Sequence, residues 1–154
     1  MKYAHENGCE WGEHVRFYAP RNNNLDIIKY LHENGYGWDS DICSHAARYN
    51  NLQIVKYLHE NGYSLNKWVC IYAAKNDNLE MLKYAHKNGC PLVILCDVAA
   101  ENNNLEMLKY LHENGCDWNV AVCIYAAKNN NLEMLKYAHE NGCPWDSYVC
   151  FYAV

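Results

Sequence analysis

The sequence predicts an all-α solenoid of stacked antiparallel helix pairs, and two observations carry this prediction. The first is a segment, Lys-Tyr-(Ala/Leu)-His-(Glu/Lys)-Asn-Gly, that occurs six times and ends in Gly8, Gly35, Gly62, Gly89, Gly115 and Gly142. Successive glycines are 27 residues apart, with one interval of 26. The second is that each period contains two apolar stretches with helical spacing. A unit of this size cannot bury its own apolar face, so its copies must stack along an axis.

The period organises the chain as a single repeat array over residues 1–154. Each unit has a first helix, here called helix A, and a second, called helix B. We expect the helix pairs near residues 13–34, 40–61, 67–88, 93–114 and 120–141, flanked by half-repeats at 1–8 and 147–154, with essentially no β-structure.

Helix A is predicted to be short and to have small side chains on its buried face. In the unit that starts at Trp38, Asp39 or Ser40 can cap the helix. The apolar positions then follow the pattern of a buried stripe: Ile42, Cys43, Ala46 and Ala47. Paired alanines recur as Ala73/Ala74, Ala99/Ala100 and Ala126/Ala127. Because alanine has little bulk, we expect a second helix to approach closely at these pairs.

A turn of two asparagines links helix A to helix B. Asn50 suits the left-handed conformation that such a turn needs, and Asn51 can cap the next helix. The equivalent turn residues are Asn23, Asp77, Asn103 and Asn130. Helix B is predicted from Leu52 to about Asn61, and Gly62 ends it in a left-handed conformation. An apolar pair after each glycine is expected to anchor the return loop: Tyr36/Trp38, Tyr63/Leu65, Cys90/Leu92, Cys116/Trp118 and Cys143/Trp145.

Composition argues against several classes of protein. The net charge of -5 and the pI near 5.9 disfavour a surface for nucleic acid or for anionic membranes, which would need a basic stripe. No apolar run approaches the length of a membrane span, and the first residues lack the apolar core of a signal peptide. The nine cysteines are odd in number and follow the repeat, which favours a reducing compartment. We therefore expect a soluble, cytoplasmic protein.

The repeat closely resembles the ankyrin repeat. The resemblance lies in residues 41–47 (Asp-Ile-Cys-Ser-His-Ala-Ala), 52–58 (Leu-Gln-Ile-Val-Lys-Tyr-Leu) and 61–62 (Asn-Gly). The chain departs from the family's Thr-Pro-Leu-His segment, and its period is about six residues shorter than the usual value of about 33. The missing residues fall near Asp39 and Ser40, where ankyrin arrays form a β-hairpin finger. The resemblance therefore implies a fingerless variant, similar to repeats of amoeba-infecting giant viruses and protists, and a viral origin would place it in the host cytoplasm.

Metal and enzyme chemistry are weighed against packing. Six histidines are in register, and some precede a cysteine by four residues, as His86 precedes Cys90. Such a pair could hold zinc, but equivalent histidines on helices stacked about 8–10 Å apart cannot share one ion. We expect these histidines to lie near helix-terminal carbonyl groups. The repeated cysteines are expected to be reduced packing residues, because equivalent positions lie too far apart for disulfides. We predict no cofactor, no metal and no enzymatic activity.

Two function classes remain. The resemblance implies a scaffold that binds a protein partner on its helix A face, and the alternative is a spacer or fragment of a longer array with no partner of its own. The fourth unit breaks the pattern, because it carries Asp97 and Glu101 where its neighbours have Lys75 and Lys128, and this favours the scaffold. The residues predicted to bind the partner are Ser40, Arg48, Tyr49, Lys67, Lys75, Asn76, Asp97, Glu101, Asn102, Lys128 and Asn129. Uncapped terminal repeats also predict possible end-to-end self-association.

Overall fold

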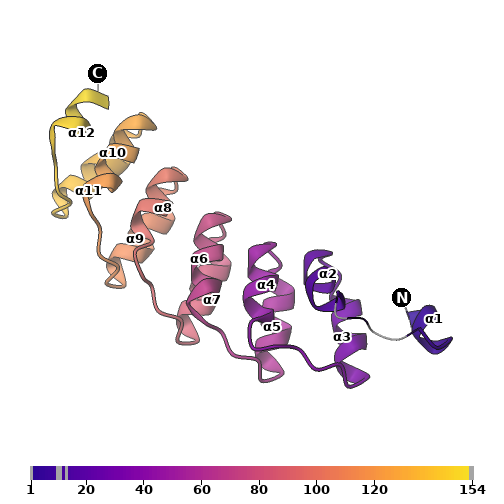
Figure 1. Ribbon diagram of the computed structural model, residues 1–154. Helices are drawn as coiled ribbons and strands as arrows, with labels where there is room; N and C mark the ends of the chain where they lie inside the picture. The colour runs from indigo at the N-terminus through magenta and orange to yellow at the C-terminus, as the bar shows by residue number, and fades with distance from the viewer. Residues whose placement is uncertain (1, 10–11, 13, 153–154) are drawn as a thin grey trace.

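The computed structural model describes residues 2–9, 12 and 14–152, apart from the side chains of residues 2, 4 and 16. Within these residues the chain forms twelve α-helices and no strand (Figure 1). The helices stack in pairs along one axis, and successive helices A pack directly on one another. The predicted fold class, an all-α solenoid, is confirmed.

The two helices of each unit alternate along the chain. The helices A are α2 (Val15–Arg21), α4 (Ile42–Arg48), α6 (Lys67–Lys75), α8 (Cys96–Glu101), α10 (Val120–Lys128) and α12 (Ser147–Tyr152). The helices B are α1 (Lys2–Glu6), α3 (Leu25–Glu33), α5 (Leu52–Glu60), α7 (Leu79–Lys87), α9 (Leu105–Glu113) and α11 (Leu132–Glu140).

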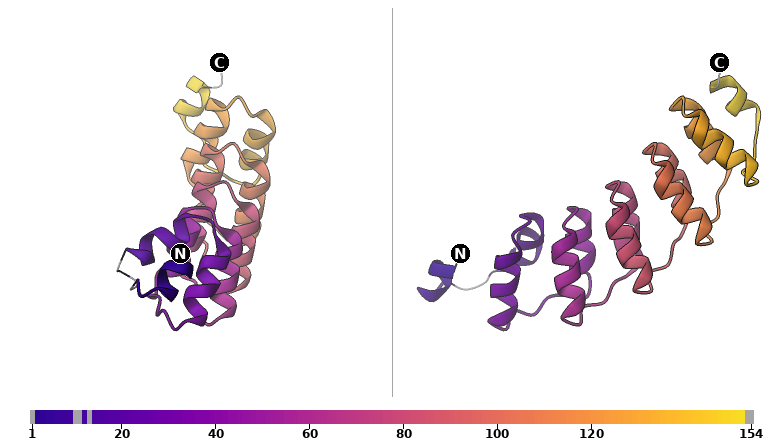
Figure 2. Two further views of the ribbon diagram at one scale, coloured as in Figure 1. Left: turned by 90° about the vertical axis from the view of Figure 1, so that its right-hand side faces the viewer. Right: turned by 180° about the vertical axis from the view of Figure 1, so that it is seen from behind.

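The array is curved. Successive helices A share more extensive contacts than successive helices B do. The turns from helix A to helix B lie on the inner side of the arc, and the loops after the glycines lie on its outer side (Figures 1 and 2). Small residues on helices A allow this close approach, because the paired alanines of α4, α6, α8 and α10 are buried.

The turn chemistry predicted from the sequence is confirmed except for the cap at Asn51, whose side chain makes no capping bond. The turn residues equivalent to Asn50 are all left-handed, with φ between 47° and 61°, and each repeated glycine is left-handed as well. The side chain of Asn78 accepts a hydrogen bond from Met81 N at 2.8 Å and so caps α7. Asn24, Asn104 and Asn131 cap their helices in the same way.

Two details of helix A differ from expectation. The residue before α4 is Asp41 and not Asp39 or Ser40, and its side chain makes no capping bond. The fourth helix A begins at Cys96 and not near residue 93. Gly89 and Ala99 are one residue closer in sequence than their equivalents in the next unit, yet the loop before α8 is longer, because the helix begins later relative to its paired alanines. Ile94 adopts φ 45°, a left-handed conformation that no α-helix accommodates, and α8 therefore loses its first turn.

Candidate protein-binding surface

The exposed side of helix A is defined most clearly in α4. Asp41, Ser44, His45 and Arg48 have the spacing that places residues on one side of a helix; Asp41 and Arg48 are exposed there, His45 is half-buried and Ser44 is buried. The opposite side, with Ile42, Cys43, Ala46 and Ala47, is fully buried. We call the side of each helix A that holds the residues equivalent to these four, together with the following turn, the helix A face.

A groove lies on this face between α4 and α6. It has a volume of about 170 Å³ and is lined by Asp41, Ser44, His45, Arg48, Trp68 and Tyr72. Trp68 is 47% exposed although it is the largest side chain of α6. Its ring stacks on that of Tyr72, with centroids 6.0 Å apart. Two aromatic rings therefore form the α6 wall of the groove.

Asn66 organises the end of the groove next to Asp41. Its side-chain oxygen accepts hydrogen bonds from the Ser44 hydroxyl at 2.8 Å and from Trp68 N at 2.9 Å, the second of which caps α6. Its amide nitrogen donates to the Asp41 carboxylate at 3.2 Å. This network links α4 to α6 and fixes the start of the Trp68 helix.

A row of charged side chains follows the C-terminal ends of helices A. It consists of Arg21, Arg48, Lys75, Glu101 and Lys128, which occupy equivalent positions in successive units, and we call it the charged row. All five residues are exposed, and no ion pair joins any of them to another described residue. Arg21 lies over the ring of Tyr49 at 5.8 Å, and Lys128 lies over that of Tyr152 at 4.5 Å.

The fold and this surface can now be compared with known proteins. A family model described as ankyrin repeats (three copies) matches residues 16–94 and again residues 43–120. The chain belongs to the ankyrin-repeat family. Ankyrin repeats are generally modules for protein–protein interaction and typically have no enzymatic activity. A search of curated proteins gives no match. Within the described part of the chain, no helix has the length and apolar character to cross a lipid bilayer.

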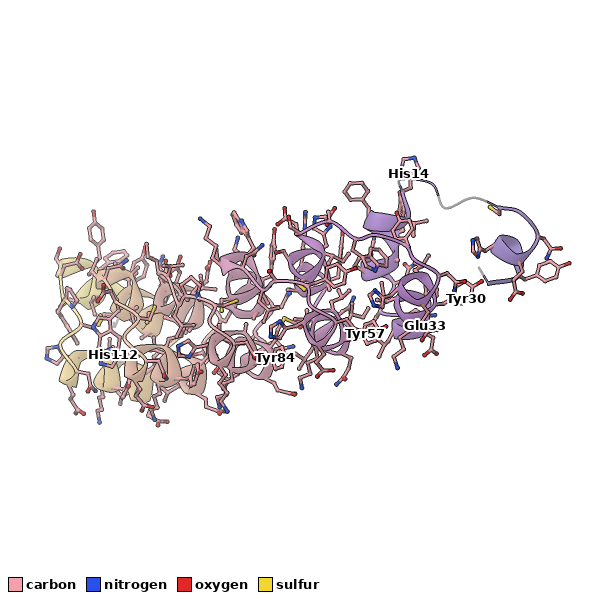
Figure 3. The ribbon with its side chains drawn as sticks, turned by 90° about the horizontal axis from the view of Figure 1, so that it is seen from below. His14, Tyr30, Glu33, Tyr57, Tyr84 and His112 are labelled. Carbon is pink, nitrogen blue, oxygen red and sulfur yellow. The ribbon has the colours of Figure 1, made fainter. Side chains whose placement is uncertain are left out.

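The opposite surface of the ankyrin array, formed by helices B, contains a regular set of bonds between repeats. Lysines pair with the glutamate of the next unit: Lys56 with Glu80 at 2.8 Å, Lys83 with Glu106 at 3.3 Å and Lys109 with Glu133 at 3.4 Å. The same lysines lie over tyrosine rings of the next unit at 5.4–5.6 Å. Burial is the main cause that raises the pKa of Tyr57, Tyr84, Tyr110 and Tyr137. Figure 3 shows Tyr57 and Tyr84 at corresponding places on neighbouring helices.

The histidines belong to this same surface. His86 Nδ1 lies 2.8 Å from the hydroxyl of Tyr110, and the two rings meet edge to face. His5, His32, His59 and His112 make the same edge-to-face contact with a tyrosine of the next repeat. The expectation that they lie against carbonyl groups is wrong except at His59, whose Nδ1 is 3.3 Å from Tyr63 O.

Several residues predicted to bind a partner bind the neighbouring ankyrin repeat instead. The amide of Asn76 donates to Ala47 O at 2.9 Å, and that of Asn102 donates to Ala74 O at 2.8 Å. Asn129 makes the equivalent bond to Ala100 O at 2.9 Å. These three asparagines therefore hold successive helices A together, and their amide groups are already occupied.

Tyr49 occupies this asparagine position in the second unit and changes the local bonding. A tyrosine ring cannot donate an amide N–H to the preceding repeat. The amide of Asn51 instead donates to Pro20 O, the carbonyl equivalent to Ala47 O. Asn51 then makes no side-chain cap on α5, unlike its equivalents. Tyr49 is 41% exposed and remains part of the helix A face.

The remaining predicted residues separate into two groups. Arg48, Lys75, Glu101 and Lys128 share the charged row. Lys67 is the first residue of α6, and Ser40 precedes α4, so both lie at the opposite, N-terminal end of helix A. Asp97 is not equivalent to Lys75 or Lys128, because it lies one turn earlier and its carboxylate accepts from Val98 N at 2.9 Å.

Sequence reasoning missed most of the groove. Trp68, Tyr72, His45, Asp41 and Ser44 were not among the predicted residues, yet they line it together with Arg48. The available signal was the alignment of helices A, in which exposed positions differ between copies. Trp68, for example, is equivalent to Asp41 and to Ala121.

Cysteines at two different positions of the same repeat form pairs. We overlooked these pairs in the sequence, because we compared only equivalent cysteines of successive repeats. Cys70 hydrogen-bonds Cys90, Cys96 hydrogen-bonds Cys116, and Cys123 hydrogen-bonds Cys143. The bond from Cys96 lowers the pKa of the Cys116 thiol to about 6, helped by the backbone N–H groups of Leu95 and Cys96. The eight cysteines from Cys43 to Cys150 form no disulfide bond.

No metal centre is assembled by these side chains. Among the described residues, no three His, Cys, Asp or Glu side chains gather as a set of metal ligands. In the candidate pair of His86 and Cys90, the imidazole bonds Tyr110 while the thiol donates to Asn66 O at 3.3 Å. The two groups therefore have separate partners.

Proposed function

We propose that the chain is a non-enzymatic scaffold that binds a protein partner on its helix A face. The observation that carries the proposal is where the repeats differ from one another. From the second copy to the fifth, buried positions of helix A barely change, as the series Cys43, Cys70, Cys96 and Cys123 shows. Exposed positions change in almost every copy, as in the series His14, Asp41, Trp68, Ile94, Ala121 and Tyr148.

The exposed side of helix B provides the internal comparison. There the copies stay nearly uniform, as in the series Lys29, Lys56, Lys83, Lys109 and Lys136. Random sequence drift would alter the exposed residues of helices A and of helices B alike, except for residues that bond to a neighbouring repeat. Diversity confined to a surface with a groove and unpaired charges supports recognition of a partner there.

The contact is expected to centre on Arg48, Tyr49 and the rings of the groove. Aromatic and guanidinium groups dominate binding energies at protein interfaces. Half-buried Asp97 and exposed Glu101 would contribute more to orientation than to affinity. The proposal includes a cytoplasmic location, which the reduced state of the eight cysteines from Cys43 to Cys150 supports.

A selection from a displayed library of random peptides tests the proposal. Ligands enriched on the parent protein should bind the folded variants Arg48→Ala and Tyr49→Ala about tenfold or more weakly. The matched control is Lys136→Ala, which removes one exposed cation from helix B. If no enriched ligand responds to the two helix A variants, the spacer alternative replaces the scaffold.

A second candidate, end-to-end self-association, is supported by one observation. On α11, Leu132 is 62% exposed beside a hollow of about 110 Å³ that Leu135, His139 and Trp145 also line. In the units before it, the equivalent Leu79 and Leu105 are partly covered by the next repeat. The apolar end of α11 therefore offers a surface on which another helix B could pack.

A further inference from the structure

We propose that the helix A face binds an extended acidic segment that crosses successive repeats. Its carboxylates would meet Arg21, Arg48 and Lys75, and an apolar side chain would enter the groove between α4 and α6. This inference rests on the proposed function and deepens it, because it specifies the chemistry and the spacing of the bound segment.

The charge of the surface identifies the ligand as acidic. Arg21, Arg48 and Lys75 occupy three consecutive places of the charged row, all exposed and without a carboxylate partner among the described residues. Helix B lysines of the same chain are paired, as Lys56 is with Glu80. In a chain of net charge -5, three adjacent unpaired cations form a local site of opposite sign. Carboxylates are the groups that complement guanidinium and ammonium ions.

The geometry of stacking sets the spacing of the acids. Equivalent positions on packed neighbouring helices are about 8–10 Å apart. An extended peptide advances about 3.3 Å per residue, so three residues cover one step of the array. Acidic residues at every third position would therefore meet Arg21, Arg48 and Lys75 in turn.

The groove places an apolar residue within that pattern. It lies between α4 and α6, and Arg48, the second place of the charged row, lines it. Its α6 wall consists of Trp68 and Tyr72, and Trp68 is half-exposed in the free protein. One aliphatic or aromatic side chain between the second and third acids would cover these rings and bury apolar surface.

Glu101 fixes the fourth place of the pattern. It interrupts the charged row between Lys75 and Lys128, and no described cation pairs with it. A fourth acid on the ligand would meet like charge there, whereas a lysine or arginine would be attracted. The expected ligand therefore carries five charged residues at intervals of three residues. The first three are acidic, the fourth is basic and the fifth is acidic. The fourth place therefore sets the register in which the peptide binds along the charged row.

A synthetic peptide with this pattern tests the inference directly. It carries glutamate at the four acidic places, lysine at the fourth place and leucine between the second and third acids. The control peptide has the same composition with its glutamates contiguous. Fluorescence anisotropy at low and physiological salt should show the patterned peptide binding about fivefold tighter, with an affinity that falls as salt rises.

Charge reversals in the protein check each contact. Arg48→Glu should weaken the patterned peptide about tenfold, while Lys136→Glu, the same change on helix B, should leave its affinity unchanged. Glu101→Lys should reverse the preference, so that a peptide with glutamate at the fourth place binds better than one with lysine. Circular dichroism confirms that each variant is folded.

The outcomes separate this inference from the proposed function. Equal affinity for the patterned and contiguous peptides, or no response to Arg48→Glu, overturns the inference. Library ligands that depend on Arg48 but carry no spaced acids also overturn it and leave the scaffold function standing. A library that gives no ligand dependent on the helix A face defeats both.

Discussion

Single side chains decide how the repeats are joined. At one position on helix A, asparagine spans the gap to the previous repeat, and its amide satisfies a carbonyl that would otherwise lose a hydrogen bond. The sequence showed that these asparagines recur but not where their side chains point. Their hydrogen-bond partners lie about 28 residues away and depend on how the units stack. We therefore predicted a partner contact for residues that hold the array together.

Replacement of Asn102 by alanine should destabilise the protein by about 1 kcal/mol. The variant loses the bond between repeats to Ala74 O and leaves that carbonyl only its backbone donors, such as Asp77 N. Asn22 occupies the equivalent position in the first unit, and its side chain makes no bond to another described residue. Asn22→Ala should therefore leave the free energy of unfolding within about 0.5 kcal/mol of the parent. Urea denaturation measures both, and equal losses would contradict the structural role of Asn102.

Cys116 should ionise well below the usual range of a thiol. Its pKa of about 6 means that the folded protein holds a thiolate at neutral pH, while Cys96 keeps its proton. Because the folded pKa lies below the unfolded value of about 9, stability gained from Cys116 rises between pH 6 and 9. This contribution is lost as the pH falls through 6.

Thiolate absorbance in the ultraviolet measures this titration. The parent should show a step near pH 6 that disappears in Cys116→Ala. Cys43→Ala is the control, because burial raises the pKa of Cys43 to about 12 and its removal should leave the step in place. A step that survives in Cys116→Ala would assign the ionisation to another group.

At the scale of the helix pair, the sequence predicted what local chemistry controls. Turn asparagines, capping asparagines and terminal glycines act within a few residues of themselves, and all were found where expected except at Asn51. The late start of α8 was not foreseen, because a one-residue deletion can be absorbed by a loop or by a helix. The structure shows that the helix absorbs it and that Ile94 adopts a left-handed conformation.

Gly62→Ala should cost about 1 kcal/mol through backbone strain alone. The residue has φ +91°, and a methyl group at its Cβ position would meet no atom within 4 Å. Gly37 is equally open but has no left-handed conformation, so Gly37→Ala should be neutral or slightly stabilising. Thermal denaturation of the two variants gives the comparison, and a similar loss in both would point to a cause other than conformation.

At the scale of the whole molecule, stacking creates a surface that no single repeat contains. The groove combines α4 with α6, so its residues are far apart in sequence, and the rings of Trp68 and Tyr72 complete it. The period predicted the array and the side on which the helices A lie. It did not predict which exposed residues converge, because that depends on the packing register of neighbouring units.

Leu132→Asn should reduce self-association without a loss of stability. Leu132 is 62% exposed on α11, so its replacement removes apolar surface from the open hollow and little from the core. Sedimentation velocity over a range of concentrations should show less oligomer than in the parent. Leu105→Asn is the contrasting variant, because Leu105 packs on the core and its loss should lower the melting temperature. Unchanged oligomer formation by Leu132→Asn would exclude the hollow as the contact.

Three ion pairs between helices B, over α5 to α11, run in one direction, from the lysine of one unit to the glutamate of the next. At these three joints the earlier unit therefore presents the same donor and the later unit the same acceptor, whereas Gln53 holds the acceptor position at the joint before them. A recombination event that deletes or duplicates one whole unit would join two surfaces that already match. Such an array can change its length in steps of one repeat while these ion pairs between units stay intact. The number of residues that a ligand must span changes with it.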